Sequence, residues 1–225
     1  MRRVIFLILS ILTLDQIIKI WVKMNMSYGE SKTVIEGWFN LQFVENPGMA
    51  FGWMLPGEGG KLALSIFRMI VAIGIGYYLF KIVKQKMHWG YITCVALIMA
   101  GALGNILDSL VYGLIFDKGC VFDPQFGDYL PYHGVAVFSS EGYAAFLMGN
   151  VVDMFHFSKE VHFPEWFPFW AGQVKELFPP VFNVADASIT SGIISIIVWQ
   201  KRFFGKKEEI ISESVEETKP DEELV

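Results

Sequence analysis

The chain has 225 residues, of which 53% are hydrophobic, and its mean hydropathy is +0.43. This composition is too apolar for an ordinary soluble domain and is typical of one compact membrane domain. The formal net charge is -5 at pH 7, and most of the acidic excess lies after Lys207. We therefore predict an integral membrane protein and expect no nucleic acid as a partner.

Four apolar runs are each about twenty residues long, which is enough for a helix to cross a bilayer. They cover residues 4–22, 65–83, 89–112 and 183–203. Arg2 and Arg3 precede the first run, as in a secretory signal. However, Asp15 and Lys19 interrupt that run and no small-residue cleavage site follows, so we interpret it as a retained anchor. The predicted fold class is an all-α membrane domain with four transmembrane helices.

Lysine and arginine in the flanks predict the orientation of these helices. They fall on one side of the predicted membrane: Arg2, Arg3, Lys81, Lys84, Lys86, Lys201, Arg202, Lys206 and Lys207. That side is cytoplasmic by the positive-inside rule, so both termini are predicted inside and the loops 23–64 and 113–182 outside. Residues 1–207 then form a single domain. We expect the acidic cytoplasmic tail, residues 208–225, to be disordered.

The two outer loops differ in character. Residues 33–44 alternate partly and are rich in β-branched and aromatic residues, which predicts a small β-element of two or three strands on the membrane surface. The second loop is long, rich in aromatic residues, and interrupted by prolines that prevent a continuous helix. Its aromatic residues favour a loop resting on the lipid headgroups. A lid over a site is the alternative.

Polar side chains gather near the outer ends of three predicted spans. These are Asp15 with Lys19, Asn105 with Asp108, and Asn183 with Asp186. Ionisable groups inside a membrane are costly and commonly mark function, so their convergence predicts a site in the outer leaflet. Two of these sets have simpler explanations. Asp15 and Lys19 have the spacing of a neutralising helical ion pair, and Asn183 and Asp186 that of a helix cap.

Asp153 lies between Val152 and Met154, without an evident ion-pair partner in the sequence. Two carboxylates in a poorly hydrated site tend to share a proton. One can then activate water while the other polarises a carbonyl, as in aspartic peptidases. If Asp153 meets Asp186, this chemistry is available, and it needs no metal and no cofactor.

Other chemistries find less support in the sequence. His156, Glu160 and His162 do not have the spacing of an HExxH zinc motif. Cys94 lies inside a predicted span and Cys120 in a loop beyond its far end, so we expect no disulfide between them.

Five short motifs, in this order on this topology, resemble bacterial lipoprotein signal peptidase, the signal peptidase II family of intramembrane aspartic peptidases. They are DQIIK at residues 15–19, NPGMAF at 46–51, GALGNILD at 101–108, VVDMF at 151–155 and FNVAD at 182–186. The resemblance implies that Asp153 and Asp186 are the catalytic pair. It further implies supporting or substrate-binding roles for Asn46, Gly48, Asn105, Asp108 and Asn183, and a structural pair of Asp15 and Lys19.

The resemblance also implies an activity. The family removes signal peptides from diacylglyceryl-modified prolipoproteins by cleaving N-terminal to the lipidated cysteine. Membrane lipid and the prolipoprotein would be the partners, and globomycin-type inhibitors would occupy the site. The expected location is the bacterial cytoplasmic (inner) membrane, with the active site near the outer leaflet.

This sequence departs from the family pattern at two points. Ser109 stands where the family usually has arginine, and we expect Arg68, near the outer end of the second span, to replace that cation. Insertions of unassigned role cover roughly residues 115–149 and 158–179. A small transporter or channel subunit with an acidic relay is the alternative, although such sites usually lie near the midplane between repeats. A scaffold whose carboxylates only cap helices is a second alternative.

Overall fold

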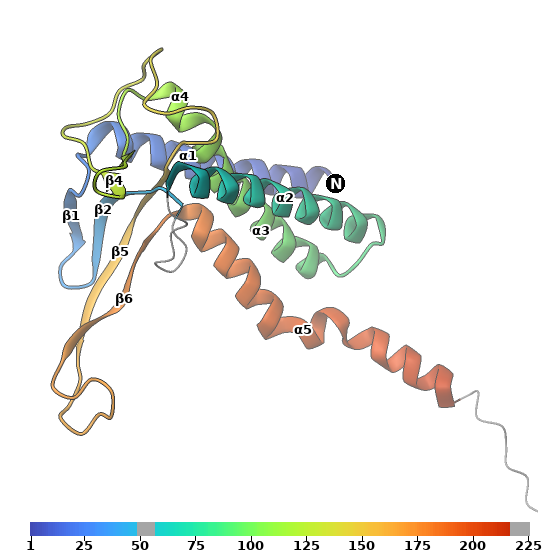
Figure 1. Cartoon of the computed structure of the whole chain (residues 1–225). Helices are drawn as coiled ribbons and strands as arrows, with labels where there is room; N and C mark the ends of the chain where they lie inside the picture. Colours follow the sequence, from blue (N-terminus) through green and yellow to red (C-terminus); the bar gives the residue numbers. More distant parts are fainter. Residues whose placement is uncertain (49–56, 217–225) are drawn as a thin grey trace, which may run out of the picture.

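The computed structural model describes residues 1–48 and 57–216. Its long helices are α1 (Arg2–Asn25), α2 (Gly57–Lys84), α3 (Trp89–Leu107) and α5 (Val184–Glu216). A π-helical turn, η1 (Asp108–Tyr112), and the short α4 (Gly113–Ile115) continue α3. The helices form a bundle with a β-sheet at one end, and the N-terminus lies at the other (Figure 1).

Within residues 1–48 and 57–216, three helical segments are long and apolar enough to cross a membrane: Arg2–Asn25, Gly59–Lys84 and Trp89–Ile115. The fourth predicted span, residues 183–203, is helical from Val184 onward as part of α5 but is not among these segments. Asp186 and Lys201 lie in it, and the helix is kinked at Trp199, where φ is -104° and ψ is 17°. That the chain crosses the membrane four times therefore remains a prediction.

The helix α5 also extends into the tail that the sequence predicts to be disordered. It continues to Glu216, through residues 208–216, where four of the nine residues are glutamate, a good helix former. The rest of the tail, residues 217–225, lies outside the described residues. The second predicted span also differs at its start: α2 begins at Gly57, earlier than the predicted start near residue 65.

The helix α3 is central and packs against α1, α2 and α5. Two of its glycines allow the closest approaches. A Cβ at Gly101 would overlap the backbone oxygen of Ala185 in α5, and one at Gly104 would lie 2.7 Å from Oδ2 of Asp15 in α1. These glycines therefore bring together the ends of α1, α3 and α5 that lie next to the sheet, where the polar motifs are.

The predicted β-element is present but larger than expected. The antiparallel sheet has the order β1-β2-β5-β6, formed by β1 (Ser31–Ile35), β2 (Phe39–Asn46), β5 (Val151–His162) and β6 (Val174–Phe182). A separate hairpin pairs β3 (Val121–Asp123) with β4 (Asp128–Leu130). The strands β1 and β2 confirm the prediction for the first outer loop. The all-α description is wrong in part, because the second loop supplies β5 and β6.

The prolines of the second loop explain why these strands are hard to predict. Pro179 and Pro180 lie within β6, where proline cannot donate a ladder hydrogen bond. An edge strand tolerates this loss, and β6 is the edge of the sheet. The strand β5 contains three valines and two phenylalanines, residue types that suit the interior of a sheet.

The register between β2 and β5 shows on which face of the sheet the side chain of Asp153 lies. Val44 pairs with Asp153, and Glu45 pairs with Val152. Since successive side chains in a strand point to opposite faces, Asp153 faces away from Val152 and Met154. Those two residues join Phe43, Val22 and other side chains in a hydrophobic core beneath the sheet. Asp153 is consequently presented on the other face, at the end of the helix bundle.

Candidate active site

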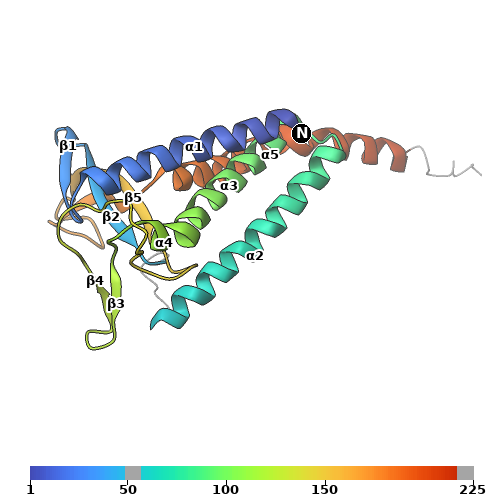
Figure 2. The same ribbon diagram turned by 90° about the horizontal axis from the view of Figure 1, so that it is seen from above.

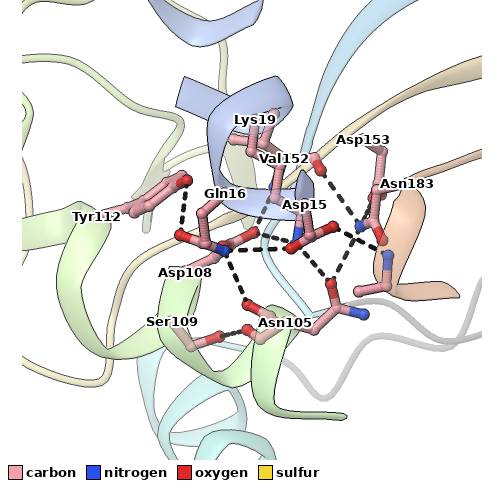
Figure 3. A network of polar contacts seen from close by, with 12 residues as sticks. Asp15, Gln16, Lys19, Asn105, Asp108, Ser109, Tyr112, Val152, Asp153 and Asn183 are labelled. Carbon is pink, nitrogen blue, oxygen red and sulfur yellow. Dashed lines mark hydrogen bonds and ion pairs between the residues drawn. The ribbon is translucent and has the colours of Figure 1, made fainter. Parts of the chain in front are cut away.

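A single buried lysine links the polar side chains of α1 and α3. Lys19 Nζ lies 2.9 Å from Asp15 Oδ2 and 2.8 Å from Asp108 Oδ2, and it donates a hydrogen bond of 2.9 Å to Asn105 Oδ1 (Figure 3). An ammonium group has three donors, and these three acceptors use all of them. Lys19 and both carboxylates are at most 1% exposed. Lys19 thus forms the ion pair with Asp15 that is expected within α1, and it also binds Asp108 and Asn105 across the helix interface.

Gln16 extends this centre and was not predicted. Its amide donates hydrogen bonds to Asp108 (2.8 Å) and Asp15 (3.2 Å), and its carbonyl oxygen accepts one from the hydroxyl of Tyr112 (3.1 Å). Asp108 also accepts a hydrogen bond of 3.2 Å from the backbone N–H of Val152. Asp108 therefore fixes the first turn of η1 to the beginning of β5. In the sequence, Gln16 is marked as an uncharged polar residue within the first apolar run and as a member of the DQIIK motif, but neither signal gives its partners.

Asp15 connects the same centre to α5. Its Oδ1 accepts a hydrogen bond of 2.9 Å from the backbone N–H of Ala185, one of the N–H groups at the start of α5. A carboxylate at a helix N-terminus satisfies a free donor and is favoured by the helix dipole. The charges of α1 thus hold the start of the helix that carries Asp186.

Two asparagines bridge Asp153 and Asp186. The side-chain amide of Asn183 donates to Asp153 Oδ1 at 2.6 Å and to Asn105 Oδ1 at 3.1 Å. The amide of Asn105 in turn donates to Asp186 Oδ1 at 2.7 Å. The two carboxylates, 33 residues apart in sequence, are thereby connected through one short hydrogen-bonded chain.

Asn183 also caps α5, as the simpler explanation of its spacing predicts. The backbone N–H of Asp186 donates to Asn183 Oδ1 at 2.9 Å, and the N–H of Asn183 donates to Asp186 Oδ2 at 3.3 Å. This is the reciprocal arrangement of a capping box. Capping and the bridge to Asp153 use different atoms of Asn183, so the two explanations are compatible.

The surroundings of the two carboxyl groups differ. Burial raises the pKa of Asp153 well above its ordinary value, and the nearby charge of Asp186 raises it further, while Lys19 and the hydrogen bond from Asn183 act in the opposite direction. Asp153 is buried and Asp186 is only half-buried. Two nearby carboxyl groups in such different surroundings are suited to acid and base roles.

Arg68 lies near this pair. It is half-buried in α2, and the charges of Asp186, Asp153 and Asp108 act on its guanidinium group. Ser109 donates only a hydrogen bond of 3.3 Å to the backbone oxygen of Asn105. Arg68 therefore supplies positive charge that Ser109 cannot.

The remaining predicted residues lie at the edge of the site. Asn46 pairs with Val151 at the beginning of β5, and its side chain accepts a hydrogen bond of 2.9 Å from the N–H of Gly48. Gly48 has φ 119°, and an added Cβ would lie 2.9 Å from Leu64, so only glycine suits this turn. Residues 49–51 of the same motif lie outside the described residues.

A second buried polar cluster, also not predicted, attaches the long loop. Glu45 forms an ion pair with Lys23 and accepts hydrogen bonds from the side chains of Tyr132 (2.9 Å) and Asn150 (2.7 Å). It lies on the face of β2 opposite to the Asp153 side of the sheet. Lys23 comes directly after the first predicted span and Glu45 directly after the predicted β-element, but no pattern in the sequence indicates that the two form an ion pair. Cys120, which donates its backbone N–H to Glu45, and Cys94 are both free and buried.

The fold and this site define a multi-pass membrane protein whose buried carboxyl groups gather where helices meet a β-sheet. Comparisons with known proteins agree. The sequence pattern of the family described as Signal peptidase (SPase) II matches residues 7–202. The chain therefore belongs to the signal peptidase II family, which confirms the resemblance seen in its motifs.

Individual relatives give the same result. The lipoprotein signal peptidase of Porphyromonas gingivalis strain W83 is 45% identical over 199 residues, which cover 87% of this chain and 81% of the relative. That of Amoebophilus asiaticus is 31% identical over 197 residues, with 84% and 73% covered. A solved bacterial membrane enzyme has a similar fold, with a TM-score of 0.57 at 21% identity, and the match covers 100% of this chain and 96% of that one.

Proposed function

We propose that this protein is an aspartic endopeptidase that removes signal peptides from diacylglyceryl-modified prolipoproteins, cutting N-terminal to the lipidated cysteine. Membership of the signal peptidase II family supports this function. The observation that carries the mechanism is the chain of hydrogen bonds from Asp153 through Asn183 and Asn105 to Asp186. This chain links two carboxyl groups from distant parts of the sequence, which supports their action as a pair.

The difference between the two carboxyl groups supports a division of labour. Asp153, whose pKa is raised by burial, holds the proton and donates a hydrogen bond to the oxygen of the scissile carbonyl. Asp186, which is more accessible, is the base that takes a proton from water. The resulting hydroxide adds to the carbonyl carbon. When the tetrahedral intermediate collapses, the C–N bond breaks and the leaving nitrogen takes a proton from the pair.

The arrangement of the chain supports the predicted topology. The N-terminus and the far end of α5 lie on the same side of the molecule, opposite to the sheet (Figures 1 and 2). Four crossings, with α5 as the fourth, would place both ends in the cytoplasm and the site near the outer leaflet of the bacterial cytoplasmic membrane. A substrate anchored in that leaflet by lipid would meet the site at the correct depth. Globomycin-type inhibitors would occupy the same site.

The direct test is cleavage of a diacylglyceryl-modified prolipoprotein by the purified protein in lipid, followed by mass spectrometry. We expect one product that begins at the lipidated cysteine, and we expect globomycin to prevent its formation. The matched control is the same prolipoprotein without the lipid. A folded protein that leaves the lipidated substrate intact would contradict the proposal.

Arg68 is expected to support this chemistry. Its charge acts on both carboxyl groups of the pair, so Arg68→Ala should lower kcat by about 10- to 100-fold, the effect of one lost charge-assisted interaction. Arg68→Lys, which keeps the charge, should retain more activity. The measurement is kcat and KM for the lipidated substrate, with thermal unfolding alongside. Unchanged folding together with unchanged kcat in Arg68→Ala would exclude the role.

A further inference from the structure

The half of α2 nearest the sheet is held mainly by polar contacts. Toward that end α2 diverges from α1, α3 and α5, and its contacts with other elements are chiefly those with α3 (Figure 2). The buried apolar side chains of its described part, Ala72, Leu79 and Ile82, lie in the second half of the helix. In the first half, the buried side chains among the described residues are those of Lys61 and Ser65. These two side chains therefore have a large part in fixing this end of α2.

Lys61 joins this end of α2 to the strand that carries Asp153. Its Nζ donates a hydrogen bond to Oδ1 of Asn150 and lies 5.1 Å from the centre of the Tyr129 ring. Asn150 is buried and immediately precedes β5, three residues before Asp153. The contact therefore connects α2 directly with the beginning of β5.

Asn150 is a fixed point, because each polar group of its side chain has a partner. It accepts the hydrogen bond from Lys61, and its amide donates to Glu45 Oε2 at 2.7 Å and to the backbone oxygen of Cys120 at 2.9 Å. Its backbone N–H donates to the hydroxyl of Tyr143 at 2.8 Å. A side-chain amide has two donor hydrogens and one acceptor oxygen, and all of them are used here. A fully bonded buried polar group is held rigidly, so Lys61 is attached to a rigid part of the structure.

Ser65 makes a second attachment one turn further along α2. Its hydroxyl donates a hydrogen bond of 2.9 Å to the backbone oxygen of Leu147. Leu147 has φ 71°, a conformation that is uncommon for residues other than glycine. Costly backbone of this kind persists only where the surrounding structure determines it. Leu147 and Tyr129 belong to the inserted residues 115–149, so the insertion supports this end of α2.

Arg68 lies on the same face of α2 as these two attachments. Lys61, Ser65 and Arg68 follow one another in steps of four and three residues, the spacing of one helix face. The charges of Asp186 and Asp153 act on the guanidinium group of Arg68. Because the helix connects them rigidly, the attachments at Lys61 and Ser65 determine where Arg68 stands relative to the carboxyl pair.

We infer that Lys61 and Ser65 are positioning residues that hold Arg68 beside the carboxyl pair. This inference rests on the proposed function. The inserted residues 115–149 then form a brace between α2 and β5, which fixes Arg68 relative to Asp153. Small displacements of a group that acts on a reaction have large effects, since a shift of about 1 Å can lower a rate by about 10²-fold.

Lys61→Met tests the inference. It removes the hydrogen bond to Asn150 and leaves both partners of the neighbouring ion pair, Lys23 and Glu45, in place. We expect kcat for a lipidated prolipoprotein to fall by about tenfold and KM to change by less than about twofold, because the reaction step is affected rather than binding. The control is Lys81→Met, the same change at an exposed lysine near the other end of α2, which should keep wild-type kcat.

A double-variant cycle with Arg68→Ala distinguishes positioning from a merely structural role. If Lys61 acts through Arg68, Lys61→Met should change kcat by less than about twofold once Arg68 is already alanine. Thermal unfolding is measured alongside, so that kcat refers to folded protein. Additive losses of kcat would overturn the inference, as would wild-type kcat in folded Lys61→Met or a loss confined to KM.

Ser65→Ala decides the matter if Lys61→Met does not fold. It removes one hydroxyl group, and alanine favours a helix, so this variant should fold. We expect kcat to fall by about two- to fivefold, and only while Arg68 is present. Unchanged kcat, or a loss that persists in the Arg68→Ala background, would then contradict the inference. Folded wild-type protein that cleaves nothing would instead contradict the proposed function and, with it, this inference.

Discussion

Asp153→Asn and Asp186→Asn are each expected to abolish cleavage of a lipidated prolipoprotein and to leave the fold intact. An amide can neither accept the proton of the attacking water nor supply one to the reacting groups. General acid–base catalysis contributes about 10²- to 10⁴-fold to a rate, so each variant should lose at least a hundredfold in kcat. The measurement is the initial rate of signal-peptide release, with thermal unfolding of the same preparations.

Thermal stability distinguishes the loss of a catalytic group from a loss of activity through unfolding. The pKa of Asp153 is raised by burial, so the folded state binds this proton more tightly than the unfolded state. Above the ordinary pKa of an aspartate, the folded state consequently holds more protons, and the group's contribution to stability falls as the pH rises. Asparagine carries no such charge. Asp153→Asn should therefore unfold at the same temperature as wild type or higher near neutral pH.

A matched control is available on the same sheet. Glu176 is an exposed carboxylate of β6 that lies 3.4 Å from His156 and away from the two asparagines of the site. Glu176→Gln makes the same chemical change and should keep wild-type activity. A folded Asp153→Asn or Asp186→Asn variant with full activity would show that the altered residue is not catalytic.

The parts of the site that depend on local helix geometry could be predicted from the sequence. Asp15 and Lys19 are one turn apart on α1, and Asn183 and Asp186 have the spacing of a helix cap, so their contacts follow from the periodicity of a helix. Their depth in the membrane follows from the ends of the apolar runs. These two relations required no knowledge of the tertiary fold.

The contacts between distant segments could not be predicted in this way. Nothing local to Lys19 indicates that it also binds Asp108 and Asn105, which approach because Gly101 and Gly104 let the helices pack closely. The strand β5 reaches the site only through its pairing with β2 and the hydrogen bond from Val152 to Asp108. Contacts between residues far apart in the sequence leave no local pattern. The order of the motifs and the family resemblance are what indicate that these segments meet.

Lys19→Met is expected to have the largest effect on stability. Lys19 is fully buried between Asp15 and Asp108, and removing it would leave two carboxylates without their cation in a site that water does not reach. Breaking a buried ion pair by removing one partner costs about 3–5 kcal/mol, which is a large part of the stability of a typical domain. We expect low yields of monodisperse protein and a large decrease in the thermal unfolding midpoint in detergent.

Neutralising a carboxylate should recover part of this loss. Lys19→Met combined with Asp108→Asn restores the charge balance of the cluster, and Asp15 can still accept its hydrogen bond from Ala185 at the start of α5. The double variant should therefore be more stable than Lys19→Met alone, so the two changes should be strongly non-additive. Lys159→Met, which removes an exposed lysine of β5, is the control and should unfold like wild type. If Lys19→Met were as stable as wild type, the buried ion centre would not be what holds α1, α3 and α5 together around the carboxyl pair.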